Sequence, residues 1–331
     1  MSSVVNFQKM EKPKIVAIVG PTASGKSSLA IHLAQRFGGQ IINADSVQVY
    51  RGLDIGTAKP SIQERMVVPH HLIDILDPEE NFSAAHFRRR ADELIHRLHQ
   101  QKIRIFVVGG TGLYLKVLTR GIFVGPARNP EIRNALQSRE EKEGHLALYQ
   151  ELQALDPLAA SRLHAHDTAR IIRALEVYYL SGKPISTFQN DHRFKEKPYE
   201  VLKLGLYCDR DELYRRIEER VNRMLQMGWI EEVRSLLNGG TKRDQKSMQS
   251  IGYRTIVSYL LGEVTFPEAV RLIQRDTRRY AKRQMTWFRA DPQIRWFQIS
   301  PLEHSAIEKT VAGFYQNAGP NAAGPQSKEK Q

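Results

Sequence analysis

The sequence predicts an α/β fold in which a mostly parallel sheet is flanked by helices and a purely helical domain is inserted into the chain. Two observations lead to this fold class. Short apolar, β-branched runs alternate with helical patterns, and one long stretch between the fourth and fifth runs carries no strand pattern. With 331 residues, 41% of them apolar, the chain is long enough for a main domain and a smaller one.

Six expected strands build the sheet, and each is followed by a helical pattern. They cover residues 14–20, 40–45, 71–76, 103–110, 201–208 and 294–299. The longest helical patterns cover residues 210–237 and 267–290, with Gly239 and Gly240 as a break between them. Since parallel α/β folds bind ligands at the carboxyl edge of the sheet, the residues that directly follow these strands are candidate site residues.

The helical insertion is predicted over residues 125–198, which leaves residues 1–124 and 199–316 for the α/β core. Apolar side chains recur in the insertion at helical spacing, namely Leu136, Leu146, Tyr149, Leu152, Ile171, Leu175 and Tyr178. Gly125 and Pro126 mark its beginning, and Pro198 marks its end. Residues 317–331 are rich in Gly, Ala, Pro, Ser and Lys, so we expect a disordered tail there.

The composition excludes several classes of protein. Cys208 is the only cysteine, so an intramolecular disulfide and a cysteine-rich zinc module are both ruled out. The longest apolar runs are far shorter than the roughly 20 residues of a membrane span, and we expect a cytoplasmic protein without one. The net charge of +13 favours polyanionic partners such as nucleic acid, but charge alone does not identify them.

A phosphate-binding loop, or P-loop, follows the first expected strand and precedes a helical pattern, which is the context that its motif requires. Its residues are Gly20, Pro21, Thr22, Ala23, Ser24, Gly25, Lys26 and Ser27. Backbone N–H groups and the helix N-terminus would bind a diphosphate, Lys26 would add a charge, and Ser27 would offer a hydroxyl ligand to Mg²⁺. The motif is typical of ATP-binding and other nucleotide-binding proteins, and it predicts a P-loop NTPase-like core.

Two further strand ends bring polar side chains to the same edge of the sheet. Asp45 follows the second strand, where its carboxylate could take a proton from a nucleophile, bind Mg²⁺ through water, or only cap the next turn. The fourth strand ends in Gly109, Gly110 and Thr111. The Thr111 hydroxyl could donate to a phosphate or contact an acceptor, while the glycines could form a simple strand-to-helix turn.

These residues alone leave the ligand open. A nucleoside on the phosphates would indicate a kinase or an ATPase, and an isoprenyl chain would indicate a transferase. A prenyltransferase acting on free nucleotides and a non-catalytic P-loop regulator are further alternatives.

The motifs together resemble those of the tRNA dimethylallyltransferases, also called tRNA isopentenyltransferases. The P-loop is one of them, and residues 43–50 and 108–114 at the two strand ends are two more. The others are residues 54–60, 70–72, 170–176, 250–253 and 282–289. The resemblance therefore extends from about Lys14 to Ile299.

The resemblance implies a reaction and roles for the residues at the sheet edge. Family members transfer a dimethylallyl group from dimethylallyl diphosphate to N6 of the adenosine 3′ of the anticodon in tRNA, and they require Mg²⁺. Asp45 matches their general base, and Lys26 and Ser27 match the residues that hold the diphosphate and its Mg²⁺. Thr111 and Arg220 match residues that line the site and face the diphosphate. The expected catalytic residues are therefore Asp45, Thr111 and Arg220.

The resemblance also implies contacts with the anticodon stem-loop of tRNA. The matching residues are Asp45, Ser46, Val47, Gln48, Thr111, Arg133, Arg170, Arg173, Gly252, Tyr253, Lys282, Arg283, Gln284, Trp287 and Arg289. Family members often carry glutamine where this chain has Ala169, so no base contact is expected there. The target adenosine must leave its stack, and we expect the helical insertion of a monomeric enzyme to grip the loop.

The helical pattern over residues 267–290 supports a nucleic-acid partner independently of the family. Val270, Ile273, Tyr280 and Trp287 recur at helical spacing and predict a packed face that includes Trp287. Basic residues gather on another side, namely Arg275, Arg278, Arg279, Lys282 and Arg283, with Asp276 nearby. This face is either solvated or in contact with the tRNA backbone.

Overall fold

The computed structural model describes residues 11–316, so the expected tail at residues 317–331 lies outside the described residues. The chain forms two compact units. One comprises the residues up to Thr119 and from Pro198 onward, and the other comprises Arg120–Lys197. Among residues 11–316, no helix combines the length and the apolar character that a bilayer span needs.

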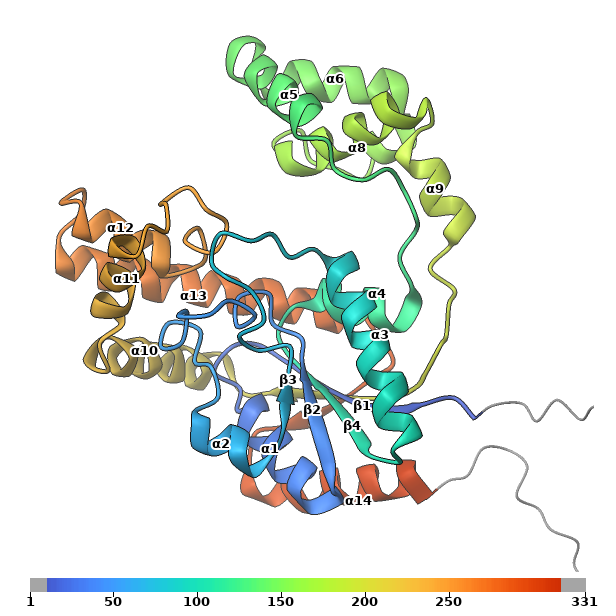
Figure 1. The fold of residues 1–331 in the computed structure, drawn as a ribbon, viewed down its shortest axis with the longest axis vertical. Coiled ribbons are helices and arrows are strands. Elements are labelled where there is room, and N and C mark those ends of the chain that lie inside the picture. The colour runs from blue at the N-terminus through green and yellow to red at the C-terminus, as the bar shows by residue number, and fades with distance from the viewer. Residues whose placement is uncertain (1–10, 317–331) are drawn as a thin grey trace, which may run out of the picture. The chain divides into compact units, whose positions relative to one another are not determined.

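The larger unit is built on a six-stranded sheet in which all neighbouring strands are parallel (Figure 1). In spatial order the strands are β3 (His70–His71), β2 (Gly39–Asn43), β4 (Arg104–Val108), β1 (Lys14–Val19), β5 (Glu200–Tyr207) and β6 (Ile294–Gln298). β1 lies near the middle, where Ile18 pairs with Val108 of β4 and with Leu204 of β5. The P-loop, which follows β1, is therefore placed at the centre of the carboxyl edge, and the expected α/β fold is confirmed.

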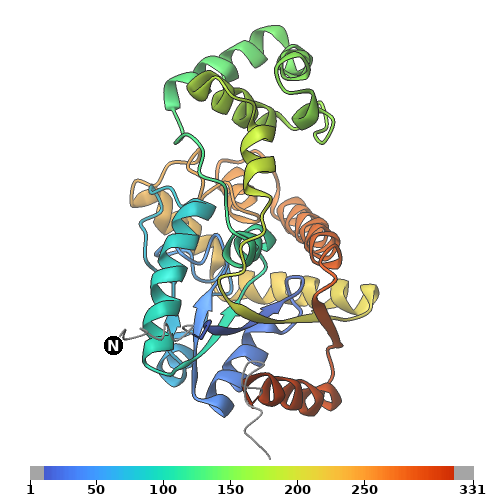
Figure 2. The ribbon, with the colours of Figure 1, turned by 90° about the vertical axis from the view of Figure 1, so that its right-hand side faces the viewer.

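Both faces of the sheet are covered, because alternate residues of a strand point to opposite sides. Val16 and Ile18 pack with α1 (Lys26–Phe37) and α14 (Pro301–Gln316). Ala17 and Val19 pack on the other face with α4 (Gly112–Arg120) and α13 (Phe266–Arg289). Figure 2 shows α1 and α14 on one side of the sheet and α13 on the other.

The remaining helices of this unit are α2 (Ile62–Val67), α3 (Ala84–Gln100), α10 (Arg210–Gln226), α11 (Trp229–Asn238) and α12 (Tyr253–Leu260). The single helical pattern expected over residues 210–237 is therefore two helices. Gly228, with φ 97°, separates them, because a left-handed residue ends α10 and begins a new direction in α11. This break allows α11 to face the loops that follow β2.

The third strand is much shorter than the expected 71–76. β3 ends at His71 because Leu72 and Asp74 have φ values of 62° and 54°, which lie outside the β region. Asp74 instead accepts hydrogen bonds from Lys59 at 2.5 Å and Arg65 at 2.6 Å. These ion pairs anchor the connection between β2 and β3.

The smaller unit is entirely helical in its regular structure. It contains α5 (Pro130–Glu143), α6 (His145–Leu155), α7 (Pro157–Ala160), α8 (Thr168–Ser181) and α9 (Ile185–His192). Leu136, Leu152, Ile171 and Leu175 are buried in its core. Leu146, which the spacing placed with them, is 55% exposed, because Leu148 and Leu152, four residues apart, form the buried face of α6.

Candidate active site

The backbone of the P-loop requires glycine at both ends. Gly20 has φ 144°, and a Cβ at this position would lie 2.6 Å from the carbonyl oxygen of Leu206. Gly25 has φ 74° and is the N-cap of α1, whose first residue is Lys26. The loop is therefore followed at once by a helix N-terminus, which is the arrangement that binds phosphate groups.

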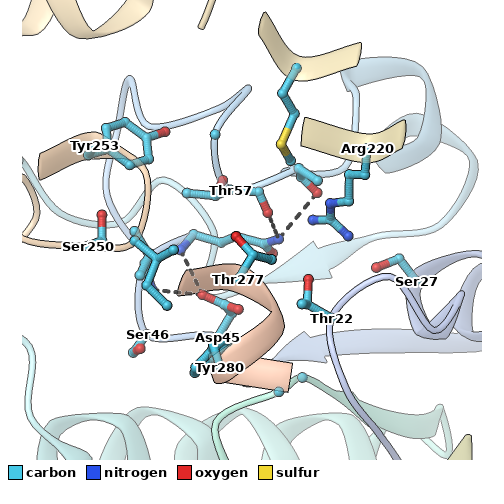
Figure 3. A pocket seen from close by; sticks show the side chains of 18 of the residues that line it. Thr22, Ser27, Asp45, Ser46, Thr57, Arg220, Ser250, Tyr253, Thr277 and Tyr280 are labelled. Carbon is cyan, nitrogen blue, oxygen red and sulfur yellow. Dashed lines mark hydrogen bonds between the residues drawn. The ribbon is translucent and has the colours of Figure 1, made fainter. Parts of the chain in front are cut away.

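A cavity of about 340 Å³ opens beside the P-loop (Figure 3). Of the P-loop residues, Thr22, Lys26 and Ser27 line it, while Gly20, Pro21, Ala23, Ser24 and Gly25 form the loop behind them. The segment after β2 contributes Asp45, Ser46, Val47 and Gln48, and α10 contributes Arg220, Val221 and Met224. The other walls are residues 56–58, 108–110 and 249–251 and one face of α13, so every wall belongs to the larger unit.

Two cations lie in this pocket, and neither is within salt-bridge distance of a carboxylate among the described residues. The Lys26 ammonium donates to the carbonyl oxygen of Pro21 at 2.6 Å. Burial and the nearby Arg220 lower the pKa of Lys26 to about 7, and Asp45 offsets only part of this. Burial also lowers the pKa of Arg220. Such poorly compensated positive charge fits a polyanionic ligand, which would stabilise the charged form of both groups.

Asp45 both caps a turn and lines the pocket. Its Oδ1 accepts hydrogen bonds from the backbone N–H groups of Val47 at 2.8 Å and Gln48 at 3.3 Å. Its Oδ2 accepts no hydrogen bond in the described part of the chain. The Asp45 side chain is therefore held in one orientation by its turn and still offers one oxygen to a ligand (Figure 3).

Thr111 lies at the rim of the pocket rather than in its wall. Its hydroxyl donates to the Ser46 hydroxyl at 3.5 Å, while Gly109 and Gly110 of the same loop line the cavity. A Cβ at Gly109 would lie 2.2 Å from the carbonyl oxygen of Ala44. The glycine thus allows the ends of β2 and β4 to approach closely, which brings Asp45 and Thr111 to one edge as the sequence predicts.

One face of α13 lines the pocket, and the sequence reasoning missed most of it. Thr277, Tyr280 and Gln284 are spaced by three and four residues and therefore share this face. The helical spacing predicts a packed face for Tyr280, although the same spacing is compatible with a pocket wall. Burial and the nearby Asp45 raise the pKa of Tyr280, so its phenol remains protonated.

The wall opposite the P-loop contains residues of two motifs of the family resemblance, 54–60 and 250–253, but its tryptophan was missed. Trp229 of α11, Gly56, Thr57 and Ala58 line it, together with Gln249, Ser250 and Ile251. Figure 3 shows Ser250 and Tyr253 on the side of the pocket away from Ser27. No local pattern marks Trp229 as a site residue, because an apolar residue at the start of a helix reads as ordinary core.

A family model described as IPP transferase matches residues 48–291, which is more than half of the chain. The chain belongs to the IPP transferase family. It is 53% identical over 309 residues to the tRNA dimethylallyltransferase of Geobacter metallireducens, covering 93% of this chain and 100% of that one. It is 54% identical over 305 residues to tRNA dimethylallyltransferase 2 of Geotalea uraniireducens, covering 92% and 98% of the two chains. The resemblance inferred from the motifs is confirmed.

Solved structures support the same family. A tRNA isopentenylpyrophosphate transferase from Bacillus halodurans is 42% identical, with a TM-score of 0.69, over 92% of this chain and 97% of that one. A eukaryotic dimethylallyltransferase described as acting on tRNA is 28% identical, with a TM-score of 0.76, over 91% and 77% of the chains. The predicted P-loop NTPase-like core is thus the fold of this IPP transferase.

In this IPP transferase, four residues of α13 for which we predict tRNA contacts lie outside the pocket on exposed positions. They are Lys282, Arg283, Trp287 and Arg289. Trp287 is 42% exposed, so its assignment to the core is wrong, and the buried aromatic residue is Phe288. The Trp287 ring instead packs on Gly112, where a Cβ would lie 2.1 Å from its Cδ1. An indole held in this way can present one face to solvent.

The basic face of α13 is more neutralised than the sequence predicts. Asp276 pairs with Arg275 at 2.9 Å and with Arg254 of α12 at 2.9 Å. Arg278 pairs with Glu218 of α10 at 2.6 Å. Arg279 also lies within 3.9 Å of Asp276, although its side chain is exposed. Among the described residues of this face, the exposed charge without an ion pair is concentrated at Lys282 and Arg283, near the end of the helix closer to Trp287.

The smaller unit holds three more predicted tRNA contacts. Arg133 and Arg173 pair with the buried carboxylate of Glu176 at 3.2 Å and 2.6 Å. Arg170 is exposed and pairs with Asp167 at 3.2 Å. Two guanidinium groups on a single carboxylate leave a net positive charge at this surface.

Gly252 and Tyr253 are enclosed by neighbouring side chains. The Tyr253 side chain is 1% exposed, and its hydroxyl donates to Glu232 at 2.6 Å. Gly252 has φ 86°, and a Cβ there would lie 2.0 Å from the Trp229 ring. Gln284 is likewise buried, with its amide bonded to the backbone of Thr22 and Gly110. Direct tRNA contacts by these three residues remain predictions.

Proposed function

We propose that this chain transfers a dimethylallyl group from dimethylallyl diphosphate to N6 of the adenosine 3′ of the anticodon in tRNA, giving N6-(dimethylallyl)adenosine and diphosphate. Relatives about half identical to it are named tRNA dimethylallyltransferases. One observation carries the proposal. A single pocket holds two cations that have no ion pair among the described residues, Lys26 and Arg220, together with the carboxylate of Asp45.

The P-loop side of the pocket is suited to a diphosphate leaving group. As the bond between the allylic carbon and the diphosphate oxygen breaks, negative charge grows on the departing oxygens. The P-loop N–H groups, Lys26 and Arg220 would stabilise this charge. Their lowered pKa values show how unfavourable these cations are without an anion, so diphosphate binding would relieve an electrostatic cost.

The Asp45 side of the pocket is suited to the acceptor. The exocyclic amine of adenine is a weak nucleophile, because its lone pair is delocalised into the ring. As N6 bonds to the allylic carbon, one N6 proton would pass to Oδ2 of Asp45, which has no hydrogen bond from the described residues, and diphosphate would leave. Thr111, at the rim, would contact the acceptor.

Magnesium fits the residues around the P-loop. The Ser27 hydroxyl lines the pocket beside Lys26 and has no hydrogen-bond partner in the described part of the chain. Residues 11–316 contain no group of three side chains that could hold a metal ion by themselves. Ser27, diphosphate oxygens and water would form the oxygen-rich shell that Mg²⁺ prefers. When bound, Mg²⁺ would neutralise charge on the leaving diphosphate.

The exposed cations would bind the RNA backbone. Lys282 and Arg283 on α13 and Arg170 in the helical unit are exposed, and each phosphate that they neutralise would release counterions. Trp287 offers an exposed aromatic face to an unstacked base. Extruding the target adenosine costs a few kcal/mol and is least costly in a loop, which favours the anticodon loop as the substrate.

The proposal is tested by incubating the protein with Mg²⁺ and labelled dimethylallyl diphosphate. One reaction contains unmodified tRNA, a second contains AMP, and a third contains the same tRNA with a guanosine 3′ of the anticodon. We expect label only in the first. Label in AMP but not in tRNA would replace the proposal by a free-nucleotide prenyltransferase, and phosphate transfer from labelled ATP to an acceptor would replace it by a kinase.

A further inference from the structure

The wall of the pocket opposite the P-loop is held by one carboxylate outside the pocket. Oε2 of Glu232 in α11 accepts hydrogen bonds from the backbone N–H groups of Asp54 at 3.0 Å and Ile55 at 2.6 Å. Its Oε1 accepts from the N–H of Gly56 at 3.3 Å and from the Tyr253 hydroxyl at 2.6 Å. Three successive N–H groups thus converge on one anion, as in the backbone nests that bind anions.

Trp229, one turn earlier in α11, lies between the two segments that Glu232 connects, residues 54–56 and residues 252–253. A Cβ at Gly56 would lie 2.0 Å from the Trp229 Nε1, and a Cβ at Gly252 would lie 2.0 Å from its ring. Trp229 is 2% exposed and lies 5.6 Å from Tyr253, with the rings nearly perpendicular. The spacing between the segments is therefore set by the indole, and their orientation by the Glu232 hydrogen bonds.

The first of these segments continues to the catalytic turn. Directly after Gly56, the carbonyl oxygens of Thr57 and Ala58 accept hydrogen bonds from the Gln48 side chain at 3.0 Å and 3.3 Å. The backbone N–H of Gln48 in turn donates to Asp45 Oδ1 at 3.3 Å. Hydrogen bonds at both ends of residues 54–58 thus connect Glu232, through this short stretch of backbone and Gln48, to Asp45.

The P-loop does not take part in these hydrogen bonds. Thr22 of the P-loop donates to Gln284 of α13, and Lys26 donates to Pro21 within the loop. None of the hydrogen bonds of Glu232 reaches residues 20–27. A change at Glu232 should therefore affect the acceptor side of the pocket and leave the diphosphate side intact.

We infer that Glu232 is a positioning residue, which orients the acceptor side of the pocket and, through Gln48, the carboxylate of Asp45. The expected loss of tRNA turnover rests on the proposed function. The role of Glu232 in holding residues 54–58 does not depend on that function. The carboxylate is the appropriate group at this position because it accepts from four donors, and because it lies in the first turn of α11, where the helix N-terminus favours a negative charge.

The test is Glu232→Gln, which preserves the shape of the side chain. An amide has one acceptor oxygen, so its NH₂ group must face either the N–H groups of Asp54 and Ile55 or the N–H of Gly56 and the Tyr253 hydroxyl. We expect kcat/KM for tRNA to fall at least tenfold, while the Kd for inorganic diphosphate changes less than twofold. Amide hydrogen exchange of residues 54–58 should accelerate at least tenfold, and that of residues 20–27 should stay unchanged.

The matched control is Glu231→Gln on the same helix. The Glu231 side chain is 65% exposed, and within residues 11–316 it pairs only with Arg234, at 3.4 Å. Its substitution should leave kcat/KM, diphosphate affinity and exchange unchanged. Tyr253→Phe removes one of the four hydrogen bonds to Glu232 and should lower kcat/KM for tRNA by a smaller factor. This milder variant provides the test if Glu232→Gln does not fold.

Two results would overturn the inference. One is an unchanged rate of exchange in residues 54–58 after loss of the carboxylate. The other is a parallel loss of diphosphate affinity and tRNA turnover, which would indicate a general structural role. The exchange measurement needs no substrate, so it remains decisive if the unaltered chain proves to modify something other than tRNA.

Discussion

The side-chain oxygen of Gln284 accepts a hydrogen bond from the backbone N–H of Thr22 at 2.8 Å. The amide nitrogen of the same side chain donates to the carbonyl oxygen of Gly110 at 3.0 Å. A Cβ at Gly110 would lie 2.1 Å from that nitrogen, so the loop after β4 is in close contact with the amide. One side chain of α13 thus connects the P-loop to the loop that carries Thr111.

We expect Gln284→Leu to weaken binding of inorganic diphosphate about tenfold and to lower stability by about 1–3 kcal/mol, because two enclosed backbone groups lose their partners. Isothermal titration and chemical denaturation measure the two effects. Gln274→Leu, on the same helix, is the control, because in the described part of the chain the Gln274 side chain bonds only to Asn222, at 3.3 Å. Unchanged diphosphate affinity in Gln284→Leu would show that the P-loop holds its shape without α13.

Diphosphate binding should take up a proton at Lys26. The pKa of Lys26 in the ligand-free protein is about 7, so its amine is mostly neutral at pH 8. A bound diphosphate raises this pKa again, and binding therefore requires proton uptake above pH 7. Affinity should fall as pH rises above 7, and Lys26 should contribute no pH dependence well below 7, where it is already charged in the free protein.

Titrations at pH 8 in two buffers of different ionisation enthalpy measure this uptake. Lys26→Met corrects for protons that the ligand itself gains or loses, so the difference between the two proteins belongs to Lys26. Equal proton uptake by both proteins would mean that Lys26 is already charged before the ligand arrives.

Asp45→Asn should reduce turnover at least about 100-fold, since an amide cannot accept the N6 proton. Asparagine keeps an oxygen for the N–H groups of Val47 and Gln48, so the turn and the affinity for tRNA should be retained. Single-turnover rates with saturating tRNA measure the first effect, and filter binding measures the second. Asp77→Asn, at an exposed carboxylate paired with Arg51, controls for the loss of one charge. Nearly normal turnover in Asp45→Asn would exclude Asp45 as the base.

The exposed end of the basic face should bind phosphates. We expect Arg279→Ala combined with Lys282→Ala to weaken tRNA binding and to reduce the slope of log Kd against log salt by about one to two. Arg234→Ala combined with Arg271→Ala removes two charges that are paired with Glu231 and Glu268. An identical salt slope in both double variants would mean that Arg279 and Lys282 do not contact tRNA phosphates and are only solvated.

The sequence was sufficient to predict the sheet, the P-loop and the position of Asp45, because each depends on a local pattern. Strand ends of a parallel sheet must meet at one edge, and this brings Lys26, Asp45 and Thr111 together without any knowledge of tertiary contacts. The family resemblance added Arg220, which lies in the middle of a helix and has no local signature of function.

The acceptor-side wall could not be predicted in the same way. Trp229 and Tyr280 are apolar or aromatic residues at helical spacing, and such a pattern does not distinguish a buried face from a face that lines a cavity. Trp287 shows the reverse error, since its spacing indicates core and its side chain is exposed. The ion pairs of Arg278 with Glu218 and of Arg254 with Asp276 also depend on tertiary contacts, because each joins two different helices.

The contact of Trp229 with two glycines has a consequence for how this protein can change during evolution. A Cβ at Gly56 would meet both the Trp229 indole and the Tyr253 ring, whose Cε2 would lie 2.6 Å away. A Cβ at Gly252 would meet the indole, and this residue also has a left-handed φ of 86°. A smaller residue at 229 would therefore still leave position 56 blocked by Tyr253, and it would still disfavour a side chain at 252 on backbone grounds. Glycine at 56 should therefore be replaced among homologues only where both 229 and 253 carry smaller side chains, while glycine at 252 should persist whatever stands at 229.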